Sequence, residues 1–230
     1  MESETGLKPH ILQAIIDRSN LSQRVYDNTY AVMTKLKEIL HELASELDEE
    51  LEESLDERVR IEYRDRGKYE AHFFFGENLL IFSMHTDIFR FGRMDAVWQN
   101  EYVSSEPDNA SCGIINVWNF LKDSFEHKRM GDEGYLVARI FVNRRMHYFV
   151  EGKGQTTFTR EGFGNYPVTK EGLTDVIESA IDYALHFDLL VPPYESQKIV
   201  TAEQFNTKME NSKMQTGKRL GYEFDTDDIL

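Results

Sequence analysis

The sequence is poor in the residues that carry covalent crosslinks and phosphate binding. A single cysteine, Cys112, among 230 residues excludes an intramolecular disulfide. Basic side chains are also scarce, because 26 lysines and arginines stand against 41 aspartates and glutamates, for a net charge of −15. Nonspecific binding to a phosphate backbone is driven by counterion release, which an acidic chain cannot provide. We therefore expect no nucleic-acid partner.

Long apolar runs are absent as well. No uncharged apolar stretch approaches the roughly 20 residues that cross a bilayer, so we expect no membrane association. Residues 1–4 lack the basic and apolar regions of a signal peptide, and a cytoplasmic location is expected. The chain has no metal cage, phosphate-binding loop or nucleophile motif, and we expect no cofactor and no bound metal.

The clearest pattern lies between Val59 and Asp87, where apolar and polar residues alternate with the period of strands. Turns containing Gly67 and Gly76 divide this stretch into three antiparallel strands. The predicted pairs are Tyr63 with Tyr69, Ile61 with Ala71 and Val59 with Phe73, then Phe75 with Leu80, Phe73 with Phe82 and Ala71 with Met84. One face of the sheet is then apolar and should meet helices.

The opposite face of these strands is predicted to be polar. Its members are Arg60, Glu62, Glu70, His72, Ser83, His85 and Asp87. Helical periodicity predicts a short amphipathic helix over 9–17 that docks on the body, a break at Asn20 and Ser22, and a long helix over 21–55. Further helices are predicted over 114–125 and 172–189, and a strand or extended connection over 97–103.

Two more strands, over 135–142 and 146–151, are predicted to form a hairpin. The fold class is therefore α+β, with an antiparallel sheet of about five strands in the order α-β-β-β-α-β-β-α and helices packed on one face. We expect a core domain over 21–191, a helical extension over 1–20 and an extension over 192–230. Thr201 and Gln204 resemble a capping box that opens a last helix.

This order of elements resembles the fold of bacterial type III secretion chaperones and of the related sensory-transduction-regulator family. The segment Ile114-Ile115-Asn116-Val117-Trp118-Asn119-Phe120-Leu121, leading into the hairpin Leu136 to Val150, is similar to the helix-then-hairpin half of those domains. The resemblance implies a noncatalytic module, often dimeric, that binds a partner segment. We accordingly expect another protein, or a second copy of the chain, as the partner.

The polar face supplies the alternative hypothesis. The predicted register places Glu62, Glu70 and His85 side by side, with Arg60, His72 and Ser83 in the next row. Two carboxylates and a histidine can share a divalent metal or perform acid–base chemistry. A solvated sheet face with the same composition is the competing interpretation. The candidate catalytic residues of a metal-dependent hydrolase or nuclease are then Glu62, Glu70, His72 and His85, and the candidate metal ligands are Glu62, Glu70 and His85.

The opening order of elements also resembles the restriction-endonuclease-like fold. That resemblance implies a carboxylate on the second strand, which Glu70 can supply, and a Glu-x-Lys on the third, where no lysine stands. Glu151-Gly152-Lys153 has this pattern but follows a different hairpin. The acidic run over 46–57 is either a docking surface or a solvated helix face. The basic residues Lys208, Lys213, Lys218 and Arg219 favour a tail that folds back on the acidic body.

Overall fold

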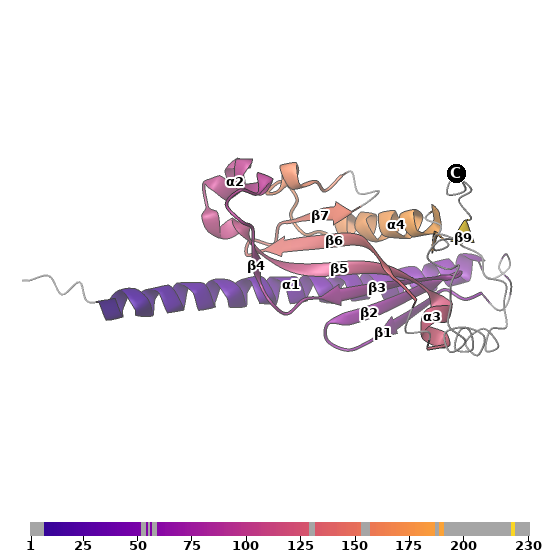
Figure 1. Ribbon diagram of the computed structural model, residues 1–230. Helices are drawn as coiled ribbons and strands as arrows, with labels where there is room; N and C mark the ends of the chain where they lie inside the picture. The colour runs from indigo at the N-terminus through magenta and orange to yellow at the C-terminus, as the bar shows by residue number, and fades with distance from the viewer. Residues whose placement is uncertain are drawn as a thin grey trace, which may run out of the picture.

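The computed structural model is an α+β protein in which an antiparallel sheet packs against helices, which confirms the predicted fold class (Figure 1). The structure describes residues 7–51, 54, 56, 59–128, 132–152, 157–186, 189–190 and 222–223. The predicted helix opened by Thr201 and Gln204 lies outside these ranges, as do the basic residues from Lys208 to Arg219.

Within the described residues, seven strands form one antiparallel sheet in the order β1-β2-β3-β5-β6-β7, with β4 paired to β5. The helices are α1 (Leu7–Leu51), α2 (Glu101–Ser104), α3 (Lys122–Glu126) and α4 (Lys170–His186). The strands are β1 (Glu62–Asp65), β2 (Glu70–Phe75), β3 (Asn78–Met84), β4 (Phe89–Arg90), β5 (Ser111–Leu121), β6 (Tyr135–Asn143) and β7 (Tyr148–Gly152), and a separate parallel pair, β8 (Leu189–Leu190) and β9 (Tyr222–Glu223).

α1 is one continuous helix of 45 residues, so the predicted break at Asn20 and Ser22 is wrong. Both side chains are exposed, and each costs the helix only about 0.5 kcal/mol of propensity, which its neighbours offset. Pro9 lies in the first turn, where its missing N–H has no partner to lose. Val25 is the first fully buried residue of the helix.

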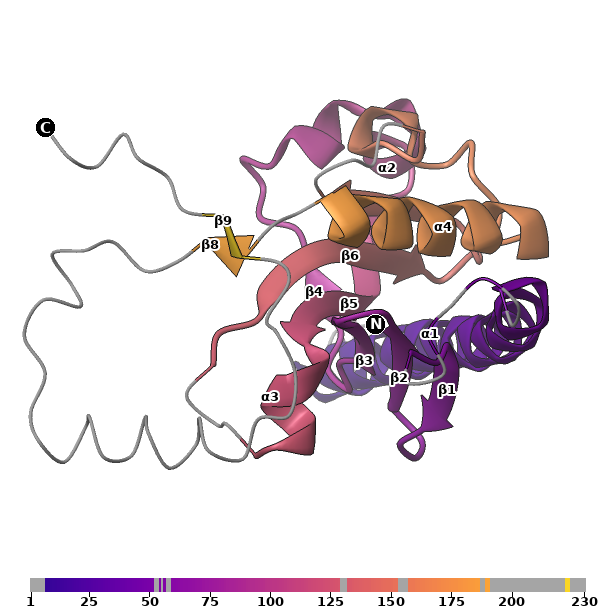
Figure 2. The ribbon, with the colours of Figure 1, turned by 90° about the vertical axis from the view of Figure 1, so that its right-hand side faces the viewer.

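The core lies between one face of the sheet and the helices α1 and α4 (Figure 2). The prediction that the apolar strand face meets helices is therefore confirmed. Alternate residues of the strands contribute the side chains on the sheet side of this core. Residues at helical spacing contribute those on the side of α1 and α4. The largest fully buried side chains of this core are Tyr148, Phe73, Phe82, Met33, Leu36, Leu40, Leu80, Ile115 and Ile140. Lys170 of α4 also pairs with Glu42 of α1 at 2.5 Å.

The first hairpin keeps the predicted faces but not the predicted register. Tyr63 pairs with Phe73, whereas the sequence predicts Tyr69 as its partner. Gly67 has a positive φ of 92° and begins the loop instead of ending it, so Arg66 N donates to the carbonyl of Glu70 at 3.2 Å. Because the partner moves by an even number of residues, every side chain stays on its predicted face.

The second hairpin shows the same kind of shift. Phe73 pairs with Leu80 instead of Phe82, because Gly76 and Glu77 alone connect Phe75 to Asn78. Gly76 has a φ of 55°, the left-handed conformation that such tight turns require.

The predicted helix over 114–125 is wrong, because residues 111–121 form β5 and only Lys122–Glu126 is helical. β5 is a central strand between β3 and β6, and side chains on both of its faces are buried. Apolar residues therefore occur on successive positions and imitate helical spacing. The β-branched residues Ile114, Ile115 and Val117 favour the strand.

The predicted strand or connection over 97–103 consists instead of short helices at Ala96–Gln99 and in α2. Each begins at a side chain that accepts a backbone hydrogen bond. Asp95 accepts from Val97 N at 2.9 Å, and Asn100 accepts from Tyr102 N at 2.9 Å. The predicted hairpin over 135–151 is confirmed as β6 and β7, and the last core helix is α4.

The face of the sheet that points away from α1 and α4 is only partly covered. One end carries Phe74, Leu79 and Ile81 with the half-buried Trp118 and Phe120, next to α3. The other end packs under α2 and the short helices near it, in a cluster of Val97, Val103, Ala110, Cys112, Ile114, Phe141, Phe149 and Phe163. The predicted polar face is therefore apolar at the end next to α3, where Phe74, Leu79 and Ile81 lie.

Candidate functional site

The predicted row of Glu62, Glu70 and His85 does not form. In the observed register Glu62 pairs with Phe74, and Glu70 pairs with Ser83. His85 lies beyond the end of β3, where its Nδ1 accepts a hydrogen bond from Asp87 N at 3.0 Å. The second predicted row fails for the same reason, because the partners of His72 are Arg64 and Ile81.

Glu70 and His72 do meet, as neighbours along β2 and not across strands. His72 Nε2 lies 2.7 Å from Glu70 Oε1, and Arg66 Nε donates to His72 Nδ1 at 3.4 Å. Since Nδ1 accepts, Nε2 carries the proton and donates it to Glu70. Burial lowers the pKa of His72, which keeps the ring neutral. The side chain is 4 % exposed, under Phe125 and beside Phe74, so both nitrogens serve the fold.

Glu62 is held by a bidentate ion pair. Arg64 donates from Nε and Nη2 to the two carboxylate oxygens at 2.6 and 2.7 Å. This hydrogen bonding holds the pKa of Glu62 below its usual range. The guanidinium also lies 4.4 Å from the centroid of the Phe74 ring. The ion pair therefore favours the carboxylate form of Glu62, whereas a general acid must carry a proton that it can donate.

The Glu-x-Lys pattern supports no nuclease centre in the described residues. Glu151 lies next to the last residue of β7 and pairs with Arg160, and Arg139 lies 3.9 Å from its other oxygen. Arg160 also donates to Asp95 at 2.8 Å. The carboxylate is thus part of a network of ion pairs across β6 and β7. Lys153 lies outside the described residues.

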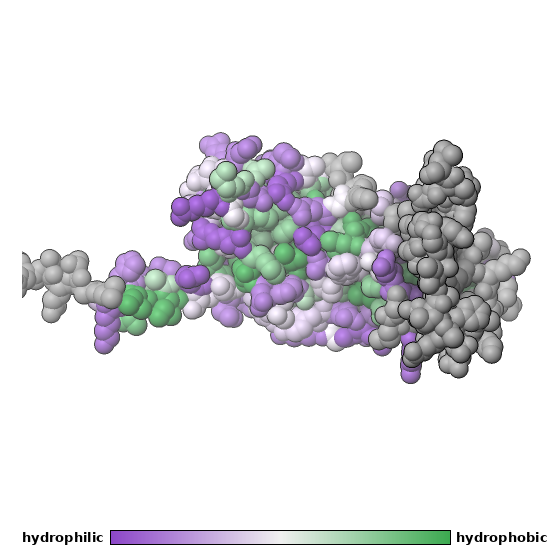
Figure 3. All heavy atoms as spheres, in the orientation of Figure 1, coloured by the Kyte–Doolittle hydropathy of each residue, from purple (hydrophilic) through white to green (hydrophobic). Residues whose placement is uncertain are grey.

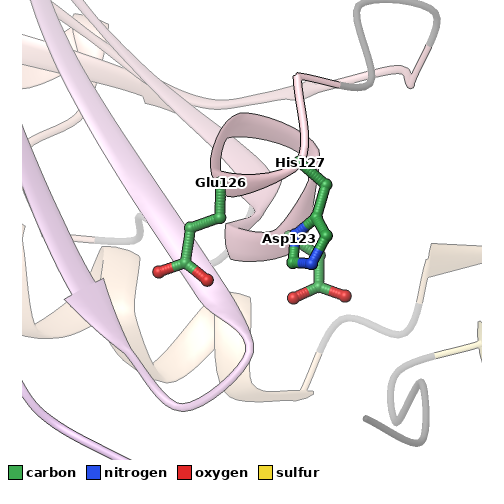
Figure 4. Close-up of side chains that lie close together, drawn as sticks. All are labelled: Asp123, Glu126 and His127. Atoms are coloured by element: carbon green, nitrogen blue, oxygen red, sulfur yellow. The ribbon is translucent and has the colours of Figure 1, made fainter. Parts of the chain in front are cut away.

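Sequence analysis missed a small cluster on α3. Asp123, Glu126 and His127 place one ligand atom each within 4.8 Å of one another, on the same side of the short helix (Figure 4). Their spacing of three and four residues is visible in the sequence. Lys122 already lies 3.7 Å from Glu126, and its ammonium would compete with a cation.

A group of exposed apolar side chains lies on the first turns of α1. We call residues 7–20 the tip, and Ile11, Leu12, Ile15 and Ile16 its stripe. The tip extends beyond the body, and hydrophobic residues gather on it in the space-filling view (Figures 1 and 3). The stripe side chains are 45, 51, 56 and 50 % exposed, so the prediction that this segment docks on the body is wrong.

Two residues of the stripe, Ile11 and Ile15, continue the line along which α1 packs on the sheet. Eighteen residues make about five turns of an α-helix, so positions separated by 18 share one side of it. Ile11 is therefore aligned with Thr29, and Ile15 with Met33, and both Thr29 and Met33 are fully buried. The tip therefore has apolar residues at the spacing of a helix that packs on a core, but these side chains are exposed.

Comparisons of the chain with models of protein families, with curated proteins and with solved structures gave no match. The family resemblance drawn from the order of elements thus stays a prediction. Its central segment, Ile114 to Leu121, is a strand and not a helix. No helix among the described residues combines the length and apolar character that a membrane span requires.

Proposed function

We propose that this protein is a noncatalytic protein-interaction module that self-associates through the stripe of the tip. One observation carries the proposal: a stripe of large aliphatic side chains, each about half exposed, on a helix that extends beyond the body. Contiguous apolar patches that are exposed to water often mark interaction sites on protein surfaces. The row of Glu62, Glu70 and His85, on which the alternative of a metal-dependent hydrolase or nuclease depends, does not form.

A second copy of the chain is the partner that fits the stripe. Two tips that cross antiparallel about a two-fold axis present the same aliphatic surface to each other. The antiparallel arrangement opposes the helix dipoles and places the bodies toward opposite ends of the pair. That separation matters because each chain carries a net charge of −15, whereas the tip has Lys8 and Arg18 against Asp17.

The stripe predicts a weak dimer. Complete burial of one large aliphatic side chain contributes about 1.5–3 kcal/mol, so completing the burial of half-exposed ones yields about 1 kcal/mol each. Four side chains on each copy therefore give roughly 8 kcal/mol, against an association cost of about 4 kcal/mol or more. The net of about 4 kcal/mol or less corresponds to a dissociation constant of about 1 mM or weaker.

Sedimentation velocity at concentrations up to about 1 mM, which is the order of that dissociation constant, tests this proposal. The wild-type chain should shift from monomer to dimer with concentration, and Ile15→Asp should remain monomeric because it places a charge in the centre of the stripe. Asn20→Asp is the matched control, since it adds the same charge at an exposed position of the tip outside the stripe. Neither variant alters the core, so their circular dichroism and thermal unfolding should match the wild type.

Two results would contradict the proposal. A wild-type chain that stays monomeric at every concentration excludes self-association. A dimer that persists in Ile15→Asp places the interface elsewhere.

A further inference from the structure

The strongest further feature is a basic pocket where α1 passes the turn between β6 and β7. The pocket has a volume of about 610 Å³ and is lined by Arg24 and Asn28 of α1 and by Arg144, Arg145, Met146 and His147 of the turn. Its lining includes three guanidinium groups and no carboxylate, in a chain with a net charge of −15. We call it the arginine pocket.

The turn that carries Arg144 and Arg145 is held in place by the fully buried Asn143. Its Oδ1 accepts hydrogen bonds from Arg145 N at 3.0 Å and from His147 N at 3.1 Å. Its Nδ2 donates to the Tyr102 hydroxyl at 2.8 Å, and its carbonyl accepts from Asn28 Nδ2 at 2.9 Å. The buried amide therefore fixes the turn to α1 on one side and to α2 on the other.

The two arginines of the turn are oriented before any ligand arrives. Arg144 Nε donates to Oδ1 of the fully buried Asn109 at 3.0 Å, and its Nη2 donates to Glu106. Arg145 donates to the other oxygen of Glu106 at 2.5 Å, and Asp108 lies 3.9 Å from Arg144. Each guanidinium has five N–H donors, so donors of both remain for a ligand.

Arg24 completes the pocket from the opposite wall. Its side chain is exposed, and no carboxylate among the residues that the structure describes forms an ion pair with it. Three guanidiniums therefore face two carboxylates, both of which lie outside the lining. The pocket therefore has an excess of positive charge, which favours an anionic ligand.

We propose that the arginine pocket binds the phosphate group of a small phosphorylated molecule. Guanidinium groups hold phosphate through paired N–H donors, and preorganised ones lose little entropy on binding. The volume lies in the range of about 300–1,000 Å³ that is typical of small-molecule sites. The net charge of the chain disfavours a polynucleotide, whose many phosphates outside the pocket would meet an acidic surface.

Isothermal titration with inorganic pyrophosphate, and with phosphoserine as the monoester, tests the site in the full-length chain at low salt. We expect a dissociation constant of about 0.1–1 mM, since a few charge-assisted hydrogen bonds on an open surface give roughly 4–5.5 kcal/mol. Arg24→Gln should weaken binding by about tenfold or more, because one such hydrogen-bonding group contributes about 1.5 kcal/mol. Arg24 forms no ion pair with the residues that the structure describes, so its removal should leave thermal unfolding unchanged.

Arg18→Gln is the matched control, because Arg18 is an exposed arginine of the same helix outside the pocket. It should leave pyrophosphate binding within about twofold of the wild type. Absence of pyrophosphate and phosphoserine binding overturns the proposal. So does equal weakening by the two variants, which would show attraction to overall charge. Acetate binding as tight as pyrophosphate binding would make the site a carboxylate site and refute the phosphate assignment.

Discussion

Replacement of Gly113 by alanine should destabilise the fold, because α1 approaches β5 closely at this residue, near the start of the strand. An added Cβ would lie 2.8 Å from Cβ and 2.9 Å from Cγ2 of Thr29, with the Thr29 hydroxyl closer still. Carbon atoms pack best at about 3.5–4.0 Å, so the helix and the strand would have to separate by several tenths of an ångström or more. Overpacking of this kind costs about 1–3 kcal/mol, and the lower chain entropy of alanine offsets at most about 1 kcal/mol.

We therefore expect Gly113→Ala to lower the free energy of unfolding by about 2 kcal/mol in urea denaturation followed by circular dichroism. Gly92→Ala is the control, since no atom lies within 4 Å of the Cβ that would be added there. Thr29→Ala should restore part of the loss in the double variant, because it removes the hydroxyl and Cγ2 but retains Cβ. Equal stabilities of Gly113→Ala and Gly92→Ala would refute the predicted contact between α1 and β5. A double variant without coupling would do the same.

Two further predictions concern buried polar groups. The hydroxyl of Tyr148 is buried without a hydrogen-bond partner among the described residues, so Tyr148→Phe should stabilise the protein by about 1 kcal/mol, and scanning calorimetry should show unfolding about 2–4 °C higher. A lower unfolding temperature would mean that the hydroxyl has a partner. Burial also lowers the pKa of His72 below its ordinary value of about 6.5, so the unfolded chain takes up the proton first as the pH falls. The stability from neutral His72 is complete above about pH 6.5 and declines below it, so urea midpoints should fall less between about pH 7 and about pH 5 in His72→Gln than in the wild type. Equal declines would contradict this role.

The sequence predicts which faces of the strands and helices are buried better than it predicts which residues pair across neighbouring strands. Alternation assigns Phe73 and Phe82 to the core, and helical spacing does the same for Leu36 and Leu40, because burial repeats with the backbone period. Register depends on where each turn begins. Gly67 can begin or end a loop with equal sequence support, and the observed choice moves every cross-strand pair of the first hairpin.

β5 shows the limit of periodicity. A strand that is buried on both faces has no polar alternation to reveal it, and Ile114, Val117 and Trp118 fit a helix equally well. The prediction for the tip is wrong for another reason. Its amphipathic pattern predicts docking on the body, but its apolar side chains remain about half exposed.

The candidate sites differ in how visible they are from sequence. The predicted Glu62, Glu70 and His85 row depended on the register and failed with it. The arginine pocket joins residues from α1 to a turn more than a hundred positions later, so no local pattern marks it. What the sequence does show is the pair Arg144-Arg145 in an acidic chain, and the spacing of Asp123, Glu126 and His127.

The continuity of α1 also sets an angular relationship between the tip and the sheet. Each residue of an α-helix turns the chain by about 100° and advances it by about 1.5 Å. The direction in which the stripe points is therefore determined by the number of residues between Ile15 and the first buried residue, Val25. One residue inserted between them would rotate the stripe by about a quarter turn about the helix axis without changing its composition. The number of residues in this part of α1 therefore sets the orientation of any partner bound to the stripe relative to the sheet.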